Sequence, residues 1–207
     1  MKNHVVTIAR SYGSAGQKVG TMLAEKLGYE LYDRNIIQMA AEESGIDEKN
    51  FEKANASKIR MPLLPNAKKM YIDIVHDKDS GQYESKENLF RFQAKIIQDL
   101  ASEKDCVILG RCSNHVLRGL NNVARVYISS PIWQCVRNVS EAEGLTAEEA
   151  EEKIAKMDKQ RADYFKYFTG EMWQDPANYD LCLNTVSLSE EDCVDMIVEY
   201  MHKRFKL

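Results

Sequence analysis

The chain has 207 residues, with 28 lysines and arginines against 32 aspartates and glutamates, and therefore a formal net charge of −4. Hydrophobic residues make up 44% and charged residues 29%, which is typical of a globular protein and excludes a disordered chain. Only 10 glycines and 4 prolines are present, which excludes collagen-like and low-complexity architectures, and the slightly acidic charge argues against broad nucleic-acid binding.

The amino-terminal part of the chain predicts a strand, a glycine loop and a helix. Residues 4–9 form a short apolar and β-branched run, which is typical of a buried strand. A turn rich in small residues follows at 12–16. Apolar residues within 19–27 then recur at helical spacing, and Gly28 is expected to end this helix.

The next part of the chain is predicted to be mainly helical. A short strand over 29–32 leads into Asp33, which we expect to cap a helix that Gly45 closes. The apolar pattern weakens over 47–85, and we predict an exposed, mostly helical segment there. Ser85 then caps a long helix whose apolar residues recur every three or four positions.

The remaining elements alternate between strands and helices. The predicted strands are 106–109, 123–129 and 179–183. Pro131 opens a helix, because its missing N–H has no cost at that position. Thr146 begins a capping-box pattern for a helix that runs to about residue 168, and Ser189 caps a final helix.

Five apolar strands separated by helices are typical of βαβ units. We therefore predict an α/β fold, a three-layer α/β/α sandwich around a five-stranded parallel sheet that is covered on both faces. Ligands of such sheets bind at the carboxyl ends of the strands. The chain places three polar segments at these ends: Arg10 to Lys18, Asp33-Arg34 and Gly110-Arg111.

The loop between the first strand and the first helix is a candidate anion site. Such a loop presents backbone N–H groups and the positive end of a helix, so phosphate is its natural ligand. A regular P-loop reads GxxxxGK[ST], with the lysine on the phosphates and the hydroxyl on Mg²⁺. Here Arg10 stands at the first glycine position and Gly16 at the lysine position. Lys18, Arg10 or an exposed Ser14 hydroxyl would have to substitute, and a plain tight turn is the alternative.

Arg111 is a second candidate for anion binding. It stands alone just past the buried strand at 106–109. The planar guanidinium of arginine suits phosphate because it donates two parallel hydrogen bonds. The four histidines have no spacing typical of metal ligands, so we predict no metal site made by protein side chains.

The amino end and the cysteines indicate a cytoplasmic protein. The first apolar run covers about six residues, shorter than a signal-peptide core of ~7–15 residues or a membrane span of ~20. The five cysteines are odd in number and no pair has CxxC spacing, which favours free, buried thiols in a reducing compartment. We expect no membrane partner.

Four segments together resemble the cytidylate kinase-like family. They are VVTIARSYGSAGQKVGTMLAEKLGYELYDRNII, CVILGRCSNHVL, RADYFKYFTGEMW and NYDLCLNT, and they extend over nearly the whole chain. The resemblance implies a P-loop fold of the nucleoside monophosphate kinase type. It also implies a phosphotransferase that moves the γ-phosphoryl group of ATP to a nucleoside monophosphate such as CMP.

The resemblance implies that the glycine loop holds the phosphates of ATP. The residues that would bind them are Arg10, Gly13, Ser14, Ala15, Gly16, Gln17 and Lys18. The family's loop reads close to YGSGG, and this chain has YGSAG at 12–16. Mg²⁺ would be held mainly through the nucleotide phosphates, because the usual hydroxyl ligand is missing.

The resemblance also implies an acceptor site built from Asp33, Arg34 and Arg111. The family's second strand ends in a motif like DSGxxYR, in which Asp33 keeps the acid while Arg34 and Met39 replace the serine and the arginine. Family members carry GRD after the third strand, with the arginine on the substrate phosphate and the aspartate on the base. Arg111 matches this arginine, but Cys112 replaces the aspartate, so recognition of cytosine stays open.

One domain over 1–207 is expected, with a helical substrate-side insertion at about 40–95 and a lid at about 145–178. On the lid, Asp158 and Arg161 are three residues apart and share a helix face. Arg161 would reach the transferring phosphoryl group when the lid closes. The predicted catalytic residues are Lys18, Arg111 and Arg161.

Two other functions fit the same residues. The missing P-loop lysine fits a non-catalytic nucleotide-binding or regulatory module, and the altered acceptor motifs fit a kinase for a small acceptor that is not a nucleotide. The aromatic residues within 164–173 are expected to pack against a core rather than to stack on a base. The oligomeric state is open, because the apolar stretch at 61–64 fits either an interface or packing against the chain's own sheet.

Overall fold

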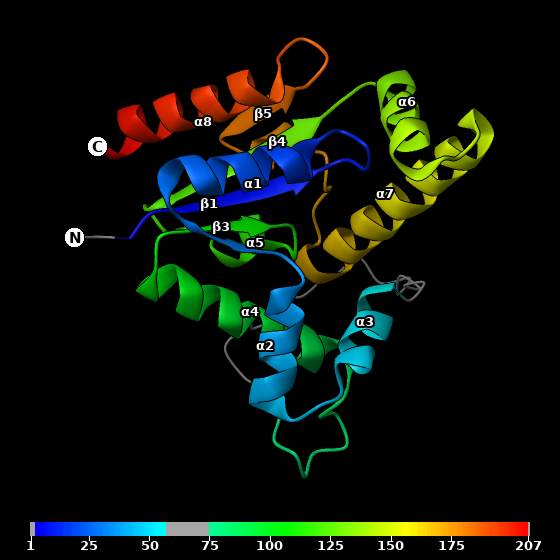
Figure 1. The fold of residues 1–207 in the computed structure, drawn as a ribbon. Coiled ribbons are helices and arrows are strands. Elements are labelled where there is room, and N and C mark those ends of the chain that lie inside the picture. Colours follow the sequence, from blue (N-terminus) through cyan, green and yellow to red (C-terminus); the bar gives the residue numbers. More distant parts are fainter. Residues whose placement is uncertain (1–2, 57–74, 207) are drawn as a thin grey trace.

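A five-stranded parallel sheet forms the centre of the computed structural model, which describes residues 3–56 and 75–206 (Figure 1). The strands are β1 (Val5–Arg10), β2 (Glu30–Tyr32), β3 (Cys106–Leu109), β4 (Val123–Ser129) and β5 (Leu181–Asn184). Their order in the sheet is β2-β3-β1-β4-β5, and every pair is parallel. This topology confirms the predicted α/β architecture.

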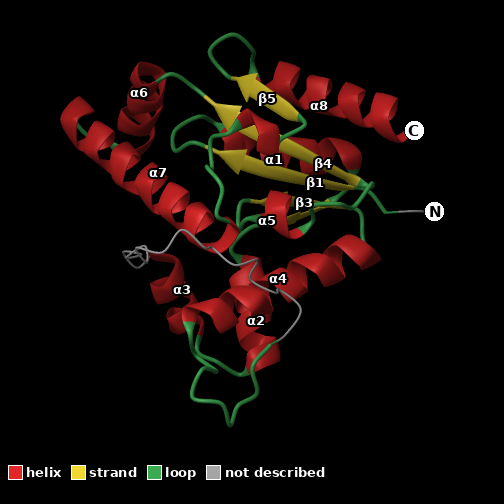
Figure 2. Cartoon of the chain, turned by 180° about the vertical axis from the view of Figure 1, so that it is seen from behind, coloured by secondary structure: helices red, strands yellow, loops and turns green. Residues whose placement is uncertain are grey.

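The helices cover both faces of this sheet. They are α1 (Gly16–Leu27), α2 (Asn35–Ser44), α3 (Glu48–Ala56), α4 (Lys86–Glu103), α5 (Ser113–Val116), α6 (Ile132–Glu143), α7 (Ala147–Thr169), the 3₁₀ turn η1 (Pro176–Asn178) and α8 (Glu190–Phe205). Figures 1 and 2 show α1 and α8 side by side over one face, with α2, α4 and α5 toward the other.

The alternation of side chains along β1 explains why both faces must be covered. Val6 and Ile8 belong to the core under α1 and α8, whereas Val5 and Ala9 belong to the core under α2 and α4. All four side chains are buried. A strand whose successive residues point to opposite apolar layers is stable only between two layers of helix.

Three of the predicted helix caps are confirmed. Ser85, Thr146 and Ser189 each accept a hydrogen bond from the backbone N–H three residues later, and the last two form complete capping boxes. The predicted Asp33 cap is wrong: α2 begins at Asn35, and the carboxylate of Asp33 lies 3.5 Å from Arg10 instead. A capping hydrogen bond contributes only about 1 kcal/mol, so a nearby buried cation competes well for the same carboxylate.

The segment predicted as exposed and mostly helical differs from that expectation in its described residues. Helix α3 covers 48–56, but 75–85 contain no helix, and the side chain of Phe51 is fully buried in the core beside α2 and α4. Helix α5 has only four residues and leaves no periodic pattern, so it was not predicted. The apolar stretch at 61–64 lies outside the described residues.

Helices α6 and α7 form an arm beyond the carboxyl ends of the strands (Figure 1). A small separate core holds the two helices together, with Cys135 and Val139 of α6 packed on Ala150 and Ile154 of α7. The arm therefore stands at the edge of the sheet where α/β folds bind ligands.

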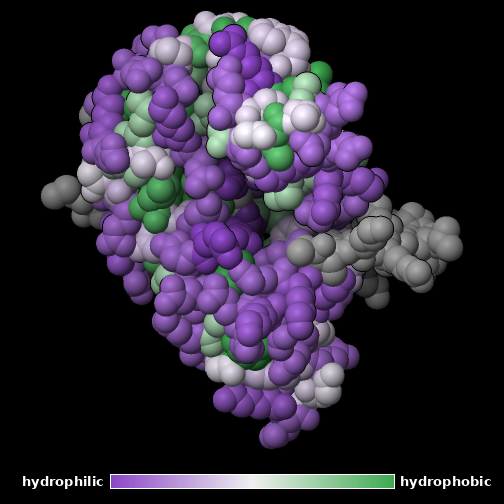
Figure 3. Space-filling model, turned by 45° about the vertical axis from the view of Figure 1, so that its right-hand side comes forward, coloured by the Kyte–Doolittle hydropathy of each residue, from purple (hydrophilic) through white to green (hydrophobic). Residues whose placement is uncertain are grey.

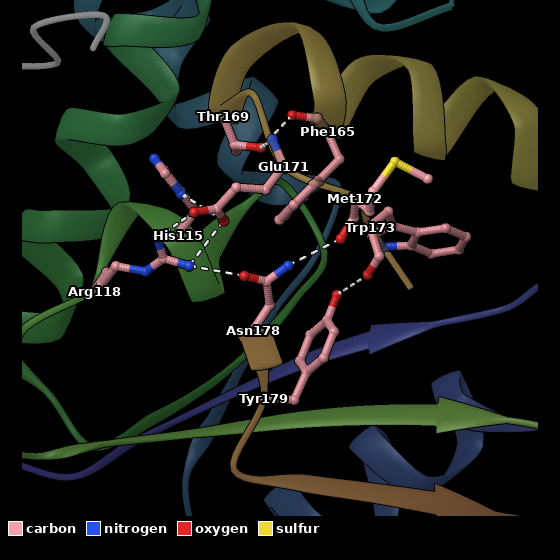
Figure 4. A network of polar contacts seen from close by, with 9 residues as sticks. All are labelled: His115, Arg118, Phe165, Thr169, Glu171, Met172, Trp173, Asn178 and Tyr179. Carbon is pink, nitrogen blue, oxygen red and sulfur yellow. Dashed lines mark hydrogen bonds and ion pairs between the residues drawn. The ribbon is translucent and has the colours of Figure 1, made fainter. Parts of the chain in front are cut away.

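The carboxyl end of α7 is anchored to the sheet by a polar network (Figure 4). The guanidinium of Arg118, just after α5, donates hydrogen bonds to Glu171 and, at 2.8 Å, to Asn178. The hydroxyl of Tyr179 donates to the carbonyl oxygen of Trp173 at 2.6 Å. Because these contacts join α5, the end of α7 and the start of β5, they fix the base of the arm.

In residues 3–56 and 75–206, none of the helices has both the length and the apolar character that a membrane span needs. The same residues contain no group of three or more histidine, cysteine, aspartate or glutamate side chains arranged to hold a metal ion. The five cysteines are free, and four of them are buried; the expectation that all are buried is wrong for Cys182, which is exposed.

Candidate functional site

Two neighbouring cavities lie at the carboxyl ends of the strands. One, of about 610 Å³, is lined by the glycine loop and α6. The other, of about 440 Å³, is lined by residues that follow β2 and β3 and by residues of α3 and α7. Arg10 and Arg161 line both cavities. Figure 3 shows this side of the molecule as mostly hydrophilic and hollowed near its middle.

The glycine loop has the backbone shape of an anion-binding turn. Gly13 and Ala15 have φ angles of 79° and 59°, in the left-handed region. A Cβ on Gly13 would lie 2.8 Å from the carbonyl oxygen of Cys135, so α6 packs directly on the loop. The N–H groups of Ala15, Gly16 and Gln17 donate no hydrogen bond to any residue that the structure describes. These donors, at the amino end of α1, face the first cavity and suit a phosphate.

The Ser14 side chain does not offer its hydroxyl to this cavity. The side chain is fully buried, and its Oγ donates to the carbonyl oxygen of Ser11 at 2.9 Å and lies 3.2 Å from that of Ile128. The expectation of an exposed hydroxyl at Ser14 is therefore wrong. Ser11, which sequence reasoning missed, lines the same cavity, and its buried Oγ has no hydrogen-bond partner among the described residues.

Lys18 lies at the rim of the first cavity. Its side chain is 61% exposed, and its Nζ is 3.3 Å from a carboxylate oxygen of Glu190 at the start of α8. An exposed ion pair of this kind contributes little to stability. The ammonium group is near the loop but not enclosed by it.

Arg10 is a largely enclosed cation of the site. Its side chain is 14% exposed, and Nη2 is 3.5 Å from a carboxylate oxygen of Asp33. Burial lowers the pKa of Arg10 to about 10, and the charge of Asp33 acts in the opposite direction. A Cβ on Gly110 would lie 2.6 Å from Nη1 of Arg10, so the guanidinium rests directly against the Gly110 backbone. The sequence placed Arg10 in the loop, but it is the last residue of β1.

Arg111 lies on a strained turn after β3. Gly110, Arg111 and Cys112 all have left-handed φ angles, of 70°, 58° and 56°. Such angles are costly for residues other than glycine, and they occur often at ligand sites. Arg111 lines the second cavity and forms no ion pair or hydrogen bond with the residues that the structure describes. The Cys112 thiol is buried beside it, and burial raises the pKa of this thiol.

Asp158 and Arg161 of α7 hold the arm against the glycine loop. The backbone N–H of Tyr12 donates to the Asp158 carboxylate at 2.8 Å, and Nη1 of Arg161 donates to the carbonyl oxygen of Arg10 at 2.9 Å. The two side chains are 3.3 Å apart, which confirms that they share a helix face. Burial raises the pKa of Asp158, although the Tyr12 N–H and Arg161 act against this shift.

The second cavity has both apolar and polar walls. Tyr164, Phe165 and Trp173 line it, and the last two are buried, which confirms the prediction that these aromatic residues pack. Asn55 and Asn114, which sequence reasoning missed, also line the cavity, and buried amide atoms of both side chains have no hydrogen-bond partner among the described residues. No local pattern marks either asparagine, because α3 and α5 reach the cavity only through tertiary packing.

Arg34 stands at the edge of this second cavity. Its side chain is 76% exposed, and Nη2 donates to a carboxylate oxygen of Glu52 at 2.6 Å. Asp33, Arg34 and Arg111 therefore line one cavity together, but Arg34 lies toward solvent.

Comparison with known sequences gives one family. A sequence model described as the cytidylate kinase-like family matches residues 5–187. A relative named cytidylate kinase, from Thermococcus kodakarensis, is 26% identical over 182 residues, which cover 87% of this chain and 79% of the relative. Another protein with the same name, from Methanopyrus kandleri, is 25% identical over 202 residues, which cover 93% and 90%.

Comparison with solved structures supports the fold. An uncharacterized protein from Eubacterium ventriosum superposes with a TM-score of 0.69 at 23% identity, over 96% of this chain and 98% of the other. A shikimate kinase from Bacteroides thetaiotaomicron gives a TM-score of 0.52 at 11% identity, over 99% of both chains. The predicted P-loop kinase type of fold is thereby confirmed.

Proposed function

The chain belongs to the cytidylate kinase-like family, and we propose that it transfers the γ-phosphoryl group of ATP to a nucleoside monophosphate such as CMP. The coarser statement, a kinase of nucleotides or similar small molecules, is supported by the family and by the kinase fold. The donor, the acceptor and the residues that bind them are our proposal.

The observation that carries the proposal is the meeting of two cavities at Arg10 and Arg161. Phosphoryl transfer requires a donor and an acceptor in line, with positive charge where the phosphoryl group passes between them. One cavity has the free amides of the glycine loop, and the other has Arg111 and Asp33. Two arginines at their junction are positioned to neutralise charge in transit.

The charge of the second cavity favours a phosphorylated acceptor. Four arginines line it, namely Arg10, Arg34, Arg111 and Arg161, against the two carboxylates of Asp33 and Glu52. This excess of two positive charges matches a phosphate monoester dianion better than a neutral sugar or a monocarboxylate. The volume of about 440 Å³ lies within the range of roughly 300–1,000 Å³ found for small-molecule sites.

In the proposed reaction, the bond between the γ-phosphorus and the oxygen of ADP breaks, while a bond forms from the γ-phosphorus to an oxygen of the acceptor phosphate. ADP and a nucleoside diphosphate leave. The loop amides and the amino end of α1 bind the donor phosphates, Arg111 binds the acceptor phosphate, and Arg161 neutralises the group in transit. The arm of α6 and α7 excludes water.

The glycine loop can hold Mg·ATP, but it lacks one Mg²⁺ ligand that a regular P-loop has. Gly16 is followed by Gln17 and Lys18, neither of which carries a hydroxyl group. Mg²⁺ would therefore be held mainly through the nucleotide phosphates, where it neutralises their charge.

The part of the acceptor cavity that would contact the base departs from the family's pattern. Cys112 stands where the family carries the aspartate that contacts the base, and its buried thiol is a weak hydrogen-bonding group. Asn55, Asn114 and Gln160 also line this cavity, and their side-chain amides are of the type that hydrogen-bonds a neutral base or hydroxyl.

The test is a measurement of ADP released from Mg·ATP with a panel of acceptors: CMP, UMP, AMP, GMP, shikimate and gluconate. We expect turnover with a nucleoside monophosphate, with CMP first, and its loss in the Arg111→Ala variant. ADP release only with a non-nucleotide acceptor would support the second kinase function. Tight ATP binding without ADP release for any acceptor would support the non-catalytic module, which the glycine at the P-loop lysine position favours.

A further inference from the structure

The position of the P-loop lysine is closed to any side chain in this protein. A Cβ on Gly16 would lie 2.5 Å from Cβ and 3.1 Å from Cγ of Arg10, and 3.2 Å from Cβ of Ile128. The nearest of these atoms is fixed to the β1 backbone, so it cannot swing away. Positions 10 and 16 therefore cannot both carry a side chain. Because residue 10 is arginine, residue 16 must be glycine.

Arg10 runs from the glycine loop to the acceptor side of the site. Its Cβ and Cγ lie against Gly16, and its guanidinium ends between Gly110 and Asp33. The same side chain lines both cavities. A single buried cation thus crosses the boundary over which a phosphoryl group would have to pass.

The charge of Arg10 is poorly balanced by the protein. Its ion pair with Asp33 is long, at 3.5 Å, and although the charges of Asp33 and Asp158 favour the cation, those of Arg161 and Arg111 oppose it. A buried cation is stable only with a counter-charge. An anionic ligand between the two cavities would supply it.

From this geometry we propose that Arg10 replaces the P-loop lysine, and that its guanidinium contacts the transferring phosphoryl group from β1 instead of from α1. The inference rests on the proposed function, since it names the cation of that same site. Lys18 is the competing cation, but it is exposed at the rim and paired with Glu190.

Because the Cβ of Arg10 blocks residue 16, the inference can be tested by moving the positive charge from residue 10 to residue 16. Replacing Arg10 by glycine removes the Cβ that blocks residue 16, whereas replacing it by alanine does not. The double variant Arg10→Gly/Gly16→Lys carries a lysine at the P-loop position and the glycine that starts that motif, while Ala15 and Gln17 stay unchanged. The matched controls are Arg10→Ala/Gly16→Lys, which keeps the clash, and Arg10→Gly/Gly16→Met, which fills the space without charge.

Two readouts are measured for each variant. The first is ADP release from Mg·ATP with the best acceptor. The second is calorimetric binding of a non-hydrolysable ATP analogue, adenylyl imidodiphosphate with Mg²⁺, which requires no turnover. Thermal unfolding reports whether each variant is folded, and Lys203→Ala, an exposed cation on α8 paired with Glu199, serves as a surface control.

We expect Arg10→Ala and Arg10→Gly to lose about 100-fold or more in turnover and roughly tenfold or more in analogue affinity. Arg10→Gly/Gly16→Lys should recover about tenfold of the lost turnover over Arg10→Gly. The methionine control should recover nothing, and Arg10→Ala/Gly16→Lys should unfold at a lower temperature without recovery.

Several results would overturn the inference. They are full turnover in folded Arg10→Ala, a folded lysine double variant no better than the methionine control, or a loss in Lys18→Ala as large as that in Arg10→Ala. If the wild-type chain binds the analogue but makes no ADP with any acceptor, the kinase proposal fails. The analogue affinities of the variants then still show whether Arg10 binds the donor phosphates. A wild-type chain that does not bind the analogue contradicts both proposals.

Discussion

Two clusters of arginines and aspartates lie at opposite ends of the sheet, and they differ in how completely they are paired. At the amino end of β5, the Asp180 carboxylate is 2.8 Å from Nη2 of Arg125 and 2.9 Å from Nη1 of Arg204. It also accepts the backbone N–H of Arg125 at 2.8 Å. The Asp180 side chain is only 11% exposed, so this cluster is closed and satisfied.

The cluster at the carboxyl ends of the strands is open by comparison. Arg10 and Asp33 are 3.5 Å apart, Arg161 and Asp158 are 3.3 Å apart, and Arg111 has no ion-pair partner among the described residues. A fully paired cluster stabilises the fold, whereas an under-paired one leaves charge available to a ligand. The same residue types therefore serve stability at one end of the sheet and binding at the other.

The largest effect is expected at Arg111. Its replacement by alanine removes an unpartnered cation from the acceptor cavity, and we expect kcat/KM to fall by about 10²–10³-fold. The free energy of unfolding should not fall, because no ion pair is lost. Steady-state kinetics and urea unfolding of the same preparation check this, and a drop in stability as large as the drop in activity would place Arg111 among the structural residues.

The opposite outcome is expected at Asp180. Asp180→Asn leaves Arg125 and Arg204 without their counter-charge, and we expect a loss of about 3 kcal/mol in the free energy of unfolding. kcat/KM of the folded fraction should stay at the wild-type level, because none of the three residues of this cluster lines either cavity. The measurements are denaturant unfolding of the variant and steady-state kinetics at a temperature below its unfolding transition. A reduced kcat/KM in the folded variant would contradict the contrast between the two clusters.

The paired cluster also predicts a pH dependence of stability. Burial alone would raise the pKa of Asp180, but hydrogen bonds from Arg125 and the charges of Arg125 and Arg204 lower it below its ordinary value of 3.8. Its contribution to stability is therefore present above pH 3.8 and is lost as the pH falls through the lowered pKa. The stability difference between wild type and Asp180→Asn should shrink below that pH. A difference that stays constant from pH 7 to 3 would contradict this assignment.

A smaller effect is expected at Gly110, where the open cluster touches the backbone. An alanine there has a left-handed φ of 70° and places its Cβ 2.6 Å from Nη1 of Arg10. We expect a stability loss of about 1 kcal/mol and a roughly tenfold fall in kcat as the guanidinium moves. Gly144→Ala, at a φ of 69° with no atom within 4 Å of its Cβ, is the matched control and should lose stability but not activity.

The smallest effect is expected at Arg34. Its exposed pair with Glu52 is worth at most about 1 kcal/mol, so Arg34→Ala should leave the unfolding temperature nearly unchanged. We expect KM for the acceptor to rise by roughly threefold or less, because solvent screens this charge. A rise in KM comparable to that in Arg111→Ala would move Arg34 from the rim to the centre of the acceptor site.

Much of the fold was accessible to sequence reasoning because its signals are local. The short apolar and β-branched run at 4–9 predicted β1, and the caps at Ser85, Thr146 and Ser189 were predicted from residues within one turn. The four-residue helix α5 escaped because it is shorter than the period that would reveal it. Domain boundaries, the insertion and the lid stay predictions.

The candidate site was accessible only in outline. Arg111 was found because a lone arginine after a buried strand is a local signal. The helix cap predicted at Asp33 and the exposed hydroxyl predicted at Ser14 were wrong, since Asp33 faces Arg10 from another strand and the Ser14 hydroxyl faces a carbonyl oxygen of β4. Asn55 and Asn114 were missed, because nothing in their neighbours distinguishes a buried unpaired amide from a surface one.

The five strands, the main helices that cover them and the place of a phosphate-type loop after β1 could be read from the sequence, because hydrophobic period, caps and turns depend on residues a few positions apart. The contacts of Arg10 with Gly16 and Gly110, and its place between two cavities, could be seen only in the folded chain. That arrangement joins β1, α1 and the turn after β3, which parallel pairing and close packing bring within a few ångströms although they are distant in the chain.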